Sequence, residues 1–293
     1  MKAPAFDYEA PATLEEALGL LQARADDAKV LAGGQSLMPM LNMRLARPAL
    51  IVDINRLPGL DYIRVAGGQL QVGALARHTA VASHPEVKKG WPVLAEAAAQ
   101  IGHDAIRNRG TLAGSLAHSD PTAEHPAVLA ALDGEVVVRS AKGERTLKAD
   151  DFFLGYLTTA LQPDELLTEV RFPALAPRTG STFVEFAPRV GDFAVVGVAA
   201  AVTLGGDGSW QDVRLALTGV GGTPFRARQA ESALKGKKPT AADIQAAAAQ
   251  VAEAIEPDSD IKASARYRRH LARTLSERAL TTAAERAAGQ GGR

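Results

Sequence analysis

Leu31-Ala32-Gly33-Gly34-Gln35-Ser36-Leu37 is the stretch around which the chain is organised. Val30 and Leu31 precede the paired glycines, so the glycines come directly after a short apolar segment. Because glycine has no Cβ, a turn built from it lets the main chain approach a bound group closely. Successive N–H groups in such a turn suit phosphate oxygens, and the hydroxyl of Ser36 is a further donor. The stretch is therefore either an anion-binding turn or a plain connection after a strand.

A second stretch of similar character lies about seventy residues further on. It reads Ile106-Arg107-Asn108-Arg109-Gly110-Thr111-Leu112-Ala113-Gly114-Ser115-Leu116-Ala117-His118-Ser119-Asp120-Pro121. It again combines small residues, hydroxyls and a carboxylate, and neither stretch matches a dinucleotide G-x-G-x-x-G fingerprint or a P-loop. Two such turns, far apart in sequence, are expected to converge on one extended ligand.

Composition excludes several classes of function. The 293 residues include 33 basic and 33 acidic side chains, so no global field attracts nucleic acid or an anionic membrane. The chain has no cysteine, which excludes disulfides, iron–sulfur ligation and thiolate-held zinc within it. His78 and His84 have no companion carboxylate at ligand spacing, so structural or solvent roles are favoured and no metal site is predicted. We expect no membrane insertion and a cytoplasmic location.

The pattern of elements predicts an α+β fold. Thr13 and Glu16 form a capping box for a first helix, and strands before and after the glycine turn give a β-α-β opening. Short helices are expected between His78 and His84 and at 91–101, and the segment after Pro121 predicts a helix at 122–132 and antiparallel sheet. Proline-rich residues 173–180 are the best candidate boundary. Beyond it we expect a three-stranded antiparallel sheet and a helix bundle, in which the strands are 182–186, 193–204 and 213–220, the helices are 226–234, 240–255 and 264–288, and a flexible tail follows at 289–293.

The sequence resembles the flavin-binding medium subunits of molybdenum hydroxylases, the family of carbon monoxide dehydrogenase and xanthine dehydrogenase. The resemblance is carried by both glycine-bearing stretches, by Pro39 and Arg44, and by Gly191-Asp192-Phe193-Ala194. It implies a two-part FAD-binding domain of the vanillyl-alcohol-oxidase-like (PCMH) type over residues 1–176, with subdomains at about 1–56 and 57–176. The C-terminal sheet-plus-helices domain would then cover 177–288.

The same resemblance implies the residues of a FAD site. Residues Ala32, Gly33, Gly34, Gln35, Ser36 and Leu37 would wrap the pyrophosphate, and Thr111, Ala113, Gly114 and Ser115 would line the other side of the cofactor. The family usually has a second glycine where this chain has Ala113, and the added methyl is tolerated if the φ of Ala113 is negative.

Three further residues have two interpretations each. Asp120 accepts hydrogen bonds from ribityl or adenosine hydroxyls, or it caps a helix that begins at Pro121. Phe193 lies beside the isoalloxazine, or it is a residue of a core strand. Leu161 approaches the ring through its backbone by analogy with the family.

By this resemblance the chain is an electron-transfer flavoprotein with no catalytic residue of its own. Iron–sulfur clusters of a small subunit would supply electrons, molybdopterin would belong to a large subunit, and the assembly would be a dimer of heterotrimers. The alternatives are a self-sufficient flavin oxidase and a flavin-free assembly subunit. The chain has no G-x-S-x-G or H-E-x-x-H motif, which favours cofactor chemistry over hydrolysis.

Overall fold

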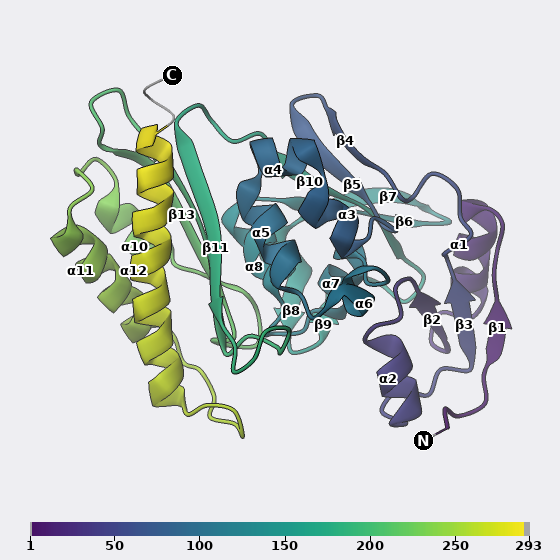
Figure 1. The fold of residues 1–293 in the computed structure, drawn as a ribbon. Coiled ribbons are helices and arrows are strands. Elements are labelled where there is room, and N and C mark those ends of the chain that lie inside the picture. Colours follow the sequence, from purple (N-terminus) through teal and green to yellow (C-terminus); the bar gives the residue numbers. More distant parts are fainter. Residues whose placement is uncertain (1, 290–293) are drawn as a thin grey trace.

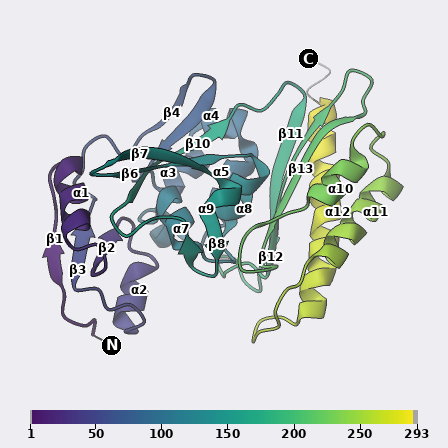
Figure 2. The same cartoon turned by 180° about the vertical axis from the view of Figure 1, so that it is seen from behind.

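A computed structural model describes residues 2–289 and arranges them as three main sheets in a row, with helices beside and between them (Figure 1). The chain passes from a parallel sheet near its N-terminus to a helical layer near its C-terminus, so β1 and α12 lie at opposite ends of the molecule in both views (Figures 1 and 2). The α+β class expected from the sequence is confirmed.

The N-terminal unit is a parallel sheet with the order β1-β3-β2. Its elements are β1 (Asp7–Glu9), α1 (Leu14–Ala23), β2 (Ala28–Leu31), α2 (Leu37–Asn42) and β3 (Leu50–Asp53). The capping box forms as predicted: the Thr13 side chain accepts from the Glu16 amide, and the Glu16 carboxylate accepts from the Thr13 amide. The β-α-β opening is confirmed, and β1 adds a strand that its three exposed residues did not reveal.

The central unit is an antiparallel sheet with the order β4-β5-β10-β6-β7. Its strands are β4 (Ile63–Ala66), β5 (Gln69–Gly73), β6 (Glu135–Ser140), β7 (Gly143–Lys148) and β10 (Leu166–Pro173). β10 is the middle strand and is buried from Leu166 to Val170, with a register shift between Leu167 and Glu169. The antiparallel sheet predicted for this part of the chain is confirmed.

Three of the helices beside this sheet were expected, at about 78–84, 91–101 and 122–132, and four further short helices accompany them. In chain order the helices are α3 (His78–Ser83), α4 (Pro85–Gly90), α5 (Pro92–Gln100), α6 (Asp104–Arg107), α7 (Leu112–His118), α8 (Glu124–Ala131) and α9 (Ala149–Phe152), and a hairpin of β8 (Phe153–Gly155) and β9 (Thr158–Thr159) follows. Most of these helices have one or two turns, which is too short for apolar periodicity to identify them.

The C-terminal unit has the order β11-β12-β13-β14, antiparallel throughout. Its elements are β11 (Thr179–Phe186), β12 (Val196–Leu204), β13 (Trp210–Thr218), β14 (Phe225–Arg226), α10 (Arg228–Leu234), α11 (Ala241–Ala254) and α12 (Ala265–Gly289). The three long strands and three helices confirm the expectation. The two-residue β14 makes a fourth strand, so the first helix begins at Arg228 instead of residue 226.

The C-terminal sheet is buried on both faces. All nine residues of β12 are buried. Ala199 and Ala201 belong to the core that continues into the central unit, where α5 and α8 contact the sheet, whereas Val198 and Ala200 belong to the core under α11 and α12. Both figures show the sheet between these two helical layers (Figures 1 and 2). Successive side chains of β12 therefore point alternately into two different cores, and the strand joins them.

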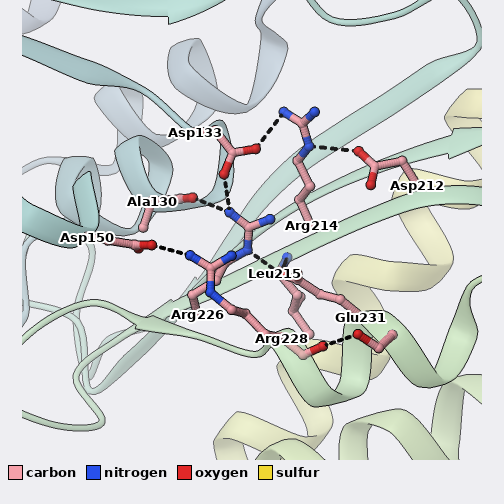
Figure 3. Close-up of polar contacts among 10 residues, drawn as sticks. Ala130, Asp133, Asp150, Asp212, Arg214, Leu215, Arg226, Arg228 and Glu231 are labelled. Carbon is pink, nitrogen blue, oxygen red and sulfur yellow. Dashed lines mark hydrogen bonds and ion pairs between the residues drawn. The ribbon is translucent and has the colours of Figure 1, made fainter. Parts of the chain in front are cut away.

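Charged contacts add to this junction (Figure 3). The Arg226 guanidinium of β14 donates to the carbonyl oxygen of Ala130 at 2.5 Å and pairs with Asp133 at 2.8 Å and with Glu231. Arg228 at the start of α10 pairs with Asp150 of α9. The two arginines differ in burial: the side chain of Arg226 is 9% exposed, and that of Arg228 is 56% exposed.

The flexible tail expected at 289–293 begins with Gly289, which is the last residue of α12, and residues 290–293 lie outside the described residues. Within residues 2–289, no helix combines the length and apolar character that crossing a bilayer requires.

Candidate cofactor-binding site

The two glycine-bearing turns are in direct contact. A Cβ on Gly33 would lie 2.4 Å from the Arg109 carbonyl oxygen and 2.6 Å from the Cα of Gly110, so only glycine fits there. Gly34 has a φ of +73°, which favours glycine for a second reason. Residues 33 and 110 are far apart in sequence, and the structure places them against each other as the sequence predicted (Figure 1, where α2 and β2 lie beside α6 and α7).

A cleft of about 500 Å³ opens beside this contact. Its lining comes from β2, the glycine turn, α2, the end of β3 and the second turn, and consists of Leu31, Ala32, Gly33, Gly34, Gln35, Met38, Pro39, Asn42, Asp53, Asn55 and Arg109. Among the described residues, the backbone amides of residues 33–36 donate no hydrogen bond to other protein groups, and the Ser36 side chain caps no amide of α2. The cleft therefore offers unused N–H donors beside an arginine, which suits a phosphate group.

A polar chain behind the cleft fixes its shape. Asn55 donates to the carbonyl oxygen of Ala32 at 2.8 Å and to Asp53 at 2.6 Å. Arg77 donates to Asn55 at 2.6 Å and to the carbonyl oxygen of Arg109, so it ties the first turn to the second. Partial burial raises the pKa of Asp53, but hydrogen bonds from Tyr8 and Asn55 outweigh this effect and hold that pKa below its usual value.

The sequence did not identify these supporting residues. Asp53 is the last residue of β3, and Asn55 and Arg77 carry no motif. Their one signal was position, because Asn55 comes shortly after β3 and Arg77 shortly after β5. Arg109 stood in the second stretch without a role assigned to it, and it lines the cleft.

The second stretch forms the start of α7. Thr111 is its N-cap, its hydroxyl accepts from the Gly114 amide at 3.0 Å, and it is 2% exposed. Ala113 lies inside the helix, 4% exposed and outside the positive-φ region, so its methyl group brings no backbone strain. Gly114 and Ser115 are half-buried. Thr111, Ala113, Gly114 and Ser115 are not among the residues that line the cleft, so their contact with the cofactor stays a prediction.

Asp120 does not cap a helix that begins at Pro121. α8 begins three residues later, at Glu124, with Ala123 as its N-cap. The carboxylate of Asp120 instead accepts from the amide of Thr122 at 2.8 Å and from its hydroxyl at 2.7 Å, which is a local turn. This leaves the cofactor interpretation of Asp120 as a prediction. Leu161 is half-buried just after β9, and its role stays a prediction as well.

Phe193 is not a core strand residue, because β12 begins only at Val196 and Phe193 is 59% exposed. The ammonium group of Lys262 lies 5.1 Å from its ring centroid. A Cβ on Gly191 would lie 2.8 Å from the carbonyl oxygen of Gly102, so the loop that carries Phe193 rests against the segment leading into α6. The stretch from Gly191 to Ala194 thus packs near the start of the second glycine-bearing stretch. A contact between Phe193 and the isoalloxazine stays a prediction.

The histidines form no metal centre. No group of three or more His, Asp or Glu side chains between residues 2 and 289 is arranged to hold a metal ion. His78 is buried and paired with a second buried histidine, His125, which agrees with the structural role favoured from the sequence.

Comparison with known protein families gives two adjoining matches. Residues 4–175 match the family model described as the FAD binding domain in molybdopterin dehydrogenase, and residues 181–283 match the CO dehydrogenase flavoprotein C-terminal domain. The fold and site thus define a flavoprotein of the oxidoreductase class, and FAD is its cofactor. The contact between Gly33 and Gly110 leaves no room for a Cβ on Gly33, and the neighbouring amides of residues 33–36 donate to no protein group. Such a turn fits the diphosphate of that cofactor.

Individual relatives cover nearly the whole chain. The 6-hydroxypseudooxynicotine dehydrogenase complex subunit alpha of Paenarthrobacter nicotinovorans is 43% identical, over 98% of this chain and 97% of its own. The carbon monoxide dehydrogenase medium chain of Hydrogenophaga pseudoflava is 39% identical, over 97% and 99%. A solved structure of carbon monoxide dehydrogenase from the same organism, lacking the Mo-pyranopterin moiety, superposes with a TM-score of 0.95 at 40% identity, over 98% of this chain and 99% of that one. The chain belongs to the family of FAD-binding medium subunits of molybdenum hydroxylases.

Proposed function

We propose that this chain is the electron-transfer subunit of a heteromeric molybdenum hydroxylase. It takes electrons from iron–sulfur clusters of a partner subunit and passes them to an external acceptor. The observation that carries the proposal is the cleft where Gly33 contacts Gly110, beside backbone amides that donate no hydrogen bond to the protein. It is supported by a relative named as a subunit of a dehydrogenase complex, which matches this chain over nearly its full length.

In this proposal each part of the chain has a separate task. The amides of residues 33–36 and the Arg109 guanidinium hold the diphosphate, and Asn55 and Arg77 keep the two turns in register. The start of α7 and Asp120 contact the rest of the cofactor, and Leu161 and Phe193 lie at the ring. Bound flavin exchanges electrons singly or in pairs, which suits an exchange between one-electron and two-electron carriers.

The remaining cofactors belong to other chains in this proposal. With no cysteine, this polypeptide has no ligands for an iron–sulfur cluster, so a small subunit carries the clusters and a large subunit carries molybdopterin. The complete assembly is proposed as a dimer of heterotrimers.

Affinity purification of the complex from its native source, with this chain tagged, tests the proposal. We expect molybdenum, iron and one FAD per chain in the eluate. A complex that contains this chain but no flavin would identify an assembly subunit, and substrate-dependent reduction of the isolated chain would identify a self-sufficient oxidase. A colourless chain that takes up no added FAD contradicts the proposal.

A further inference from the structure

A pair of buried histidines lies behind the second glycine turn. His78 is the first residue of α3, His125 lies in the first turn of α8, and Nδ1 of His78 is 3.1 Å from Nε2 of His125. Their exposed fractions are 4% and 1%. We infer that this pair is a positioning element of the cofactor cleft: it presses the Gly110 backbone against Gly33, and it does so only while both imidazoles are uncharged. The inference rests on the proposed function, because the ligand it affects is FAD.

The contact between the pair and the cleft runs through Gly110. A Cβ on Gly110 would lie 2.7 Å from Cδ2 and 2.8 Å from Nε2 of His78, so the ring packs directly on the glycine backbone. The His78 amide donates to the Gly110 carbonyl oxygen at 3.0 Å, and the Leu112 amide donates to that of Ala76 at 3.2 Å. Since the other side of Gly110 touches Gly33, a displacement of His78 is transmitted to the cleft wall.

The hydrogen bond between the rings fixes one tautomer. Nδ1 of His125 is buried and has no partner among the described residues. A buried N–H without an acceptor is rarer and less favourable than a buried lone pair, so this nitrogen is unprotonated. His125 therefore donates from Nε2 to Nδ1 of His78, and His78 carries its own proton on Nε2, facing Gly110.

The surroundings of the pair oppose a positive charge. Burial, followed by the positive charges of Arg107 and Arg77, lowers the pKa of His78 to about 4. Burial, followed by the charge of His78, holds the pKa of His125 well below its usual value.

No carboxylate within the described residues forms a salt bridge with either ring. On the helices around the pair, α6 carries Asp104, which pairs with Arg107, and α5 carries Glu96, which pairs with Arg286. α8 carries Glu124, whose pKa burial raises to about 8, with a further contribution from Glu185. A proton added to the pair would place two N–H groups face to face, so protonation requires the rings to separate.

FAD titration of the full chain at pH 7.5 and 5.5 tests the inference. A ring that accepts a proton only when the cleft opens raises the ratio of open to closed cleft by about tenfold at pH 5.5. Wild type, with two such rings, should therefore lose FAD affinity at pH 5.5 by up to about a hundredfold, and His125→Gln, which keeps a donor for His78 and leaves one titrating ring, should lose at most about tenfold. His125→Leu removes the donor and should weaken FAD binding already at pH 7.5, by about tenfold. His84→Gln, at the residue that follows α3, should follow wild type.

Hydrogen exchange on the flavin-free chain at pH 7.5 gives a readout that does not depend on FAD. The amides of His78 and Leu112 should be protected in wild type and His125→Gln and should exchange faster in His125→Leu. An unchanged acid profile in His125→Gln, or unchanged protection in His125→Leu, overturns the inference. If wild type binds no FAD at pH 7.5, the proposed function fails, and the exchange rates still decide the role of the pair.

Discussion

A methyl group on Gly33 would overlap the backbone of the second turn at 2.4 Å from the Arg109 carbonyl oxygen. We expect Gly33→Ala to destabilise the fold by about 1–3 kcal/mol, because the clash is with backbone that cannot rotate away. Separating the turns should also weaken FAD binding by at least about tenfold. Fluorescence titration with FAD and urea unfolding measure the two effects. The control is Gly19→Ala in α1, where a Cβ meets nothing within 4 Å; equal FAD affinity in both variants would contradict the role of the contact.

Ala113 gives a prediction of the opposite kind. The residue is helical and buried, so the family's usual glycine is not required here by backbone conformation. Ala113→Gly should lower the free energy of unfolding by about 0.5–1 kcal/mol, since glycine is a poor helix residue. FAD affinity should not improve. A clear gain in affinity on titration would show instead that the methyl group obstructs the cofactor.

A buried carboxyl, Glu124, and a partly buried one, Glu185, give the chain a pH dependence in the alkaline direction. Burial, followed by the charge of Glu185, raises the pKa of Glu124 to about 8, and burial raises the pKa of Glu185 to about 7. Because the folded pKa values exceed the unfolded ones, both carboxyls stabilise the fold fully only below about pH 4.5, and this contribution is lost as pH rises through 7 and 8. Urea unfolding at pH 6 and pH 9 should show the loss. Glu124→Gln should reduce it, and an equal loss in that variant would contradict the assignment.

At the scale of elements, β14 and α10 attach to the central unit through two arginines with different surroundings (Figure 3). Arg226→Ala leaves the nearly buried Glu231 without its charged partner and should destabilise the protein by about 3 kcal/mol. Arg228→Ala breaks a pair between two exposed side chains and should change stability by no more than about 1 kcal/mol. Urea unfolding of both variants gives the comparison. Similar effects would mean that the buried contacts of Arg226 do not hold this junction.

Elements with a regular pattern over several turns were predictable from sequence, and short ones were not. Thr13 and Glu16 marked the start of α1, and Gly205-Gly206-Asp207-Gly208 is a typical hairpin sequence between the strands expected at 193–204 and 213–220. In contrast, β14 exists because Phe225 and Arg226 pair with β13, and two residues have no periodicity to detect. The start of α8 at Glu124 was also not predictable, because the Asp120 carboxylate accepts a hydrogen bond from the Thr122 amide in a local turn. No local sequence signal distinguishes that turn from a helix cap.

The site was predictable where its chemistry is local and hidden where it depends on distant packing. Gly33 and Gly34 alone predict a turn, so the wall of the cleft that this turn forms was predictable from the sequence. The second wall depends on Arg109 and its tie to Arg77, two residues of the central unit that meet only when that unit has folded, and on the contact of Gly110 with Gly33 of the first unit. The same holds for His78 and His125, which lie 47 residues apart and looked unrelated in the sequence.

On the scale of the whole molecule, the boundary expected near residue 176 runs through one of the two cores, which contains residues from both sides of it. Phe183 lies beyond that boundary and is 3% exposed, yet it packs in the same core as Phe172 of β10. Glu96 of α5 reinforces the junction, because it accepts from the Phe183 amide at 2.9 Å and pairs with Arg286 of α12 at 2.6 Å. Folding of either side alone would leave a large apolar face in water.

We therefore expect the full chain to unfold in one calorimetric transition, with the two parts melting together. Phe183→Ala should lower the free energy of unfolding by about 3–5 kcal/mol and move that single transition as a whole, because the side chain fills a core common to both parts. Val190→Ala, at a side chain fully exposed in the loop before β12, is the control and should leave the transition in place. Two resolved transitions, with Phe183→Ala shifting only one of them, would show that the parts are energetically independent and that the common core contributes little to their association.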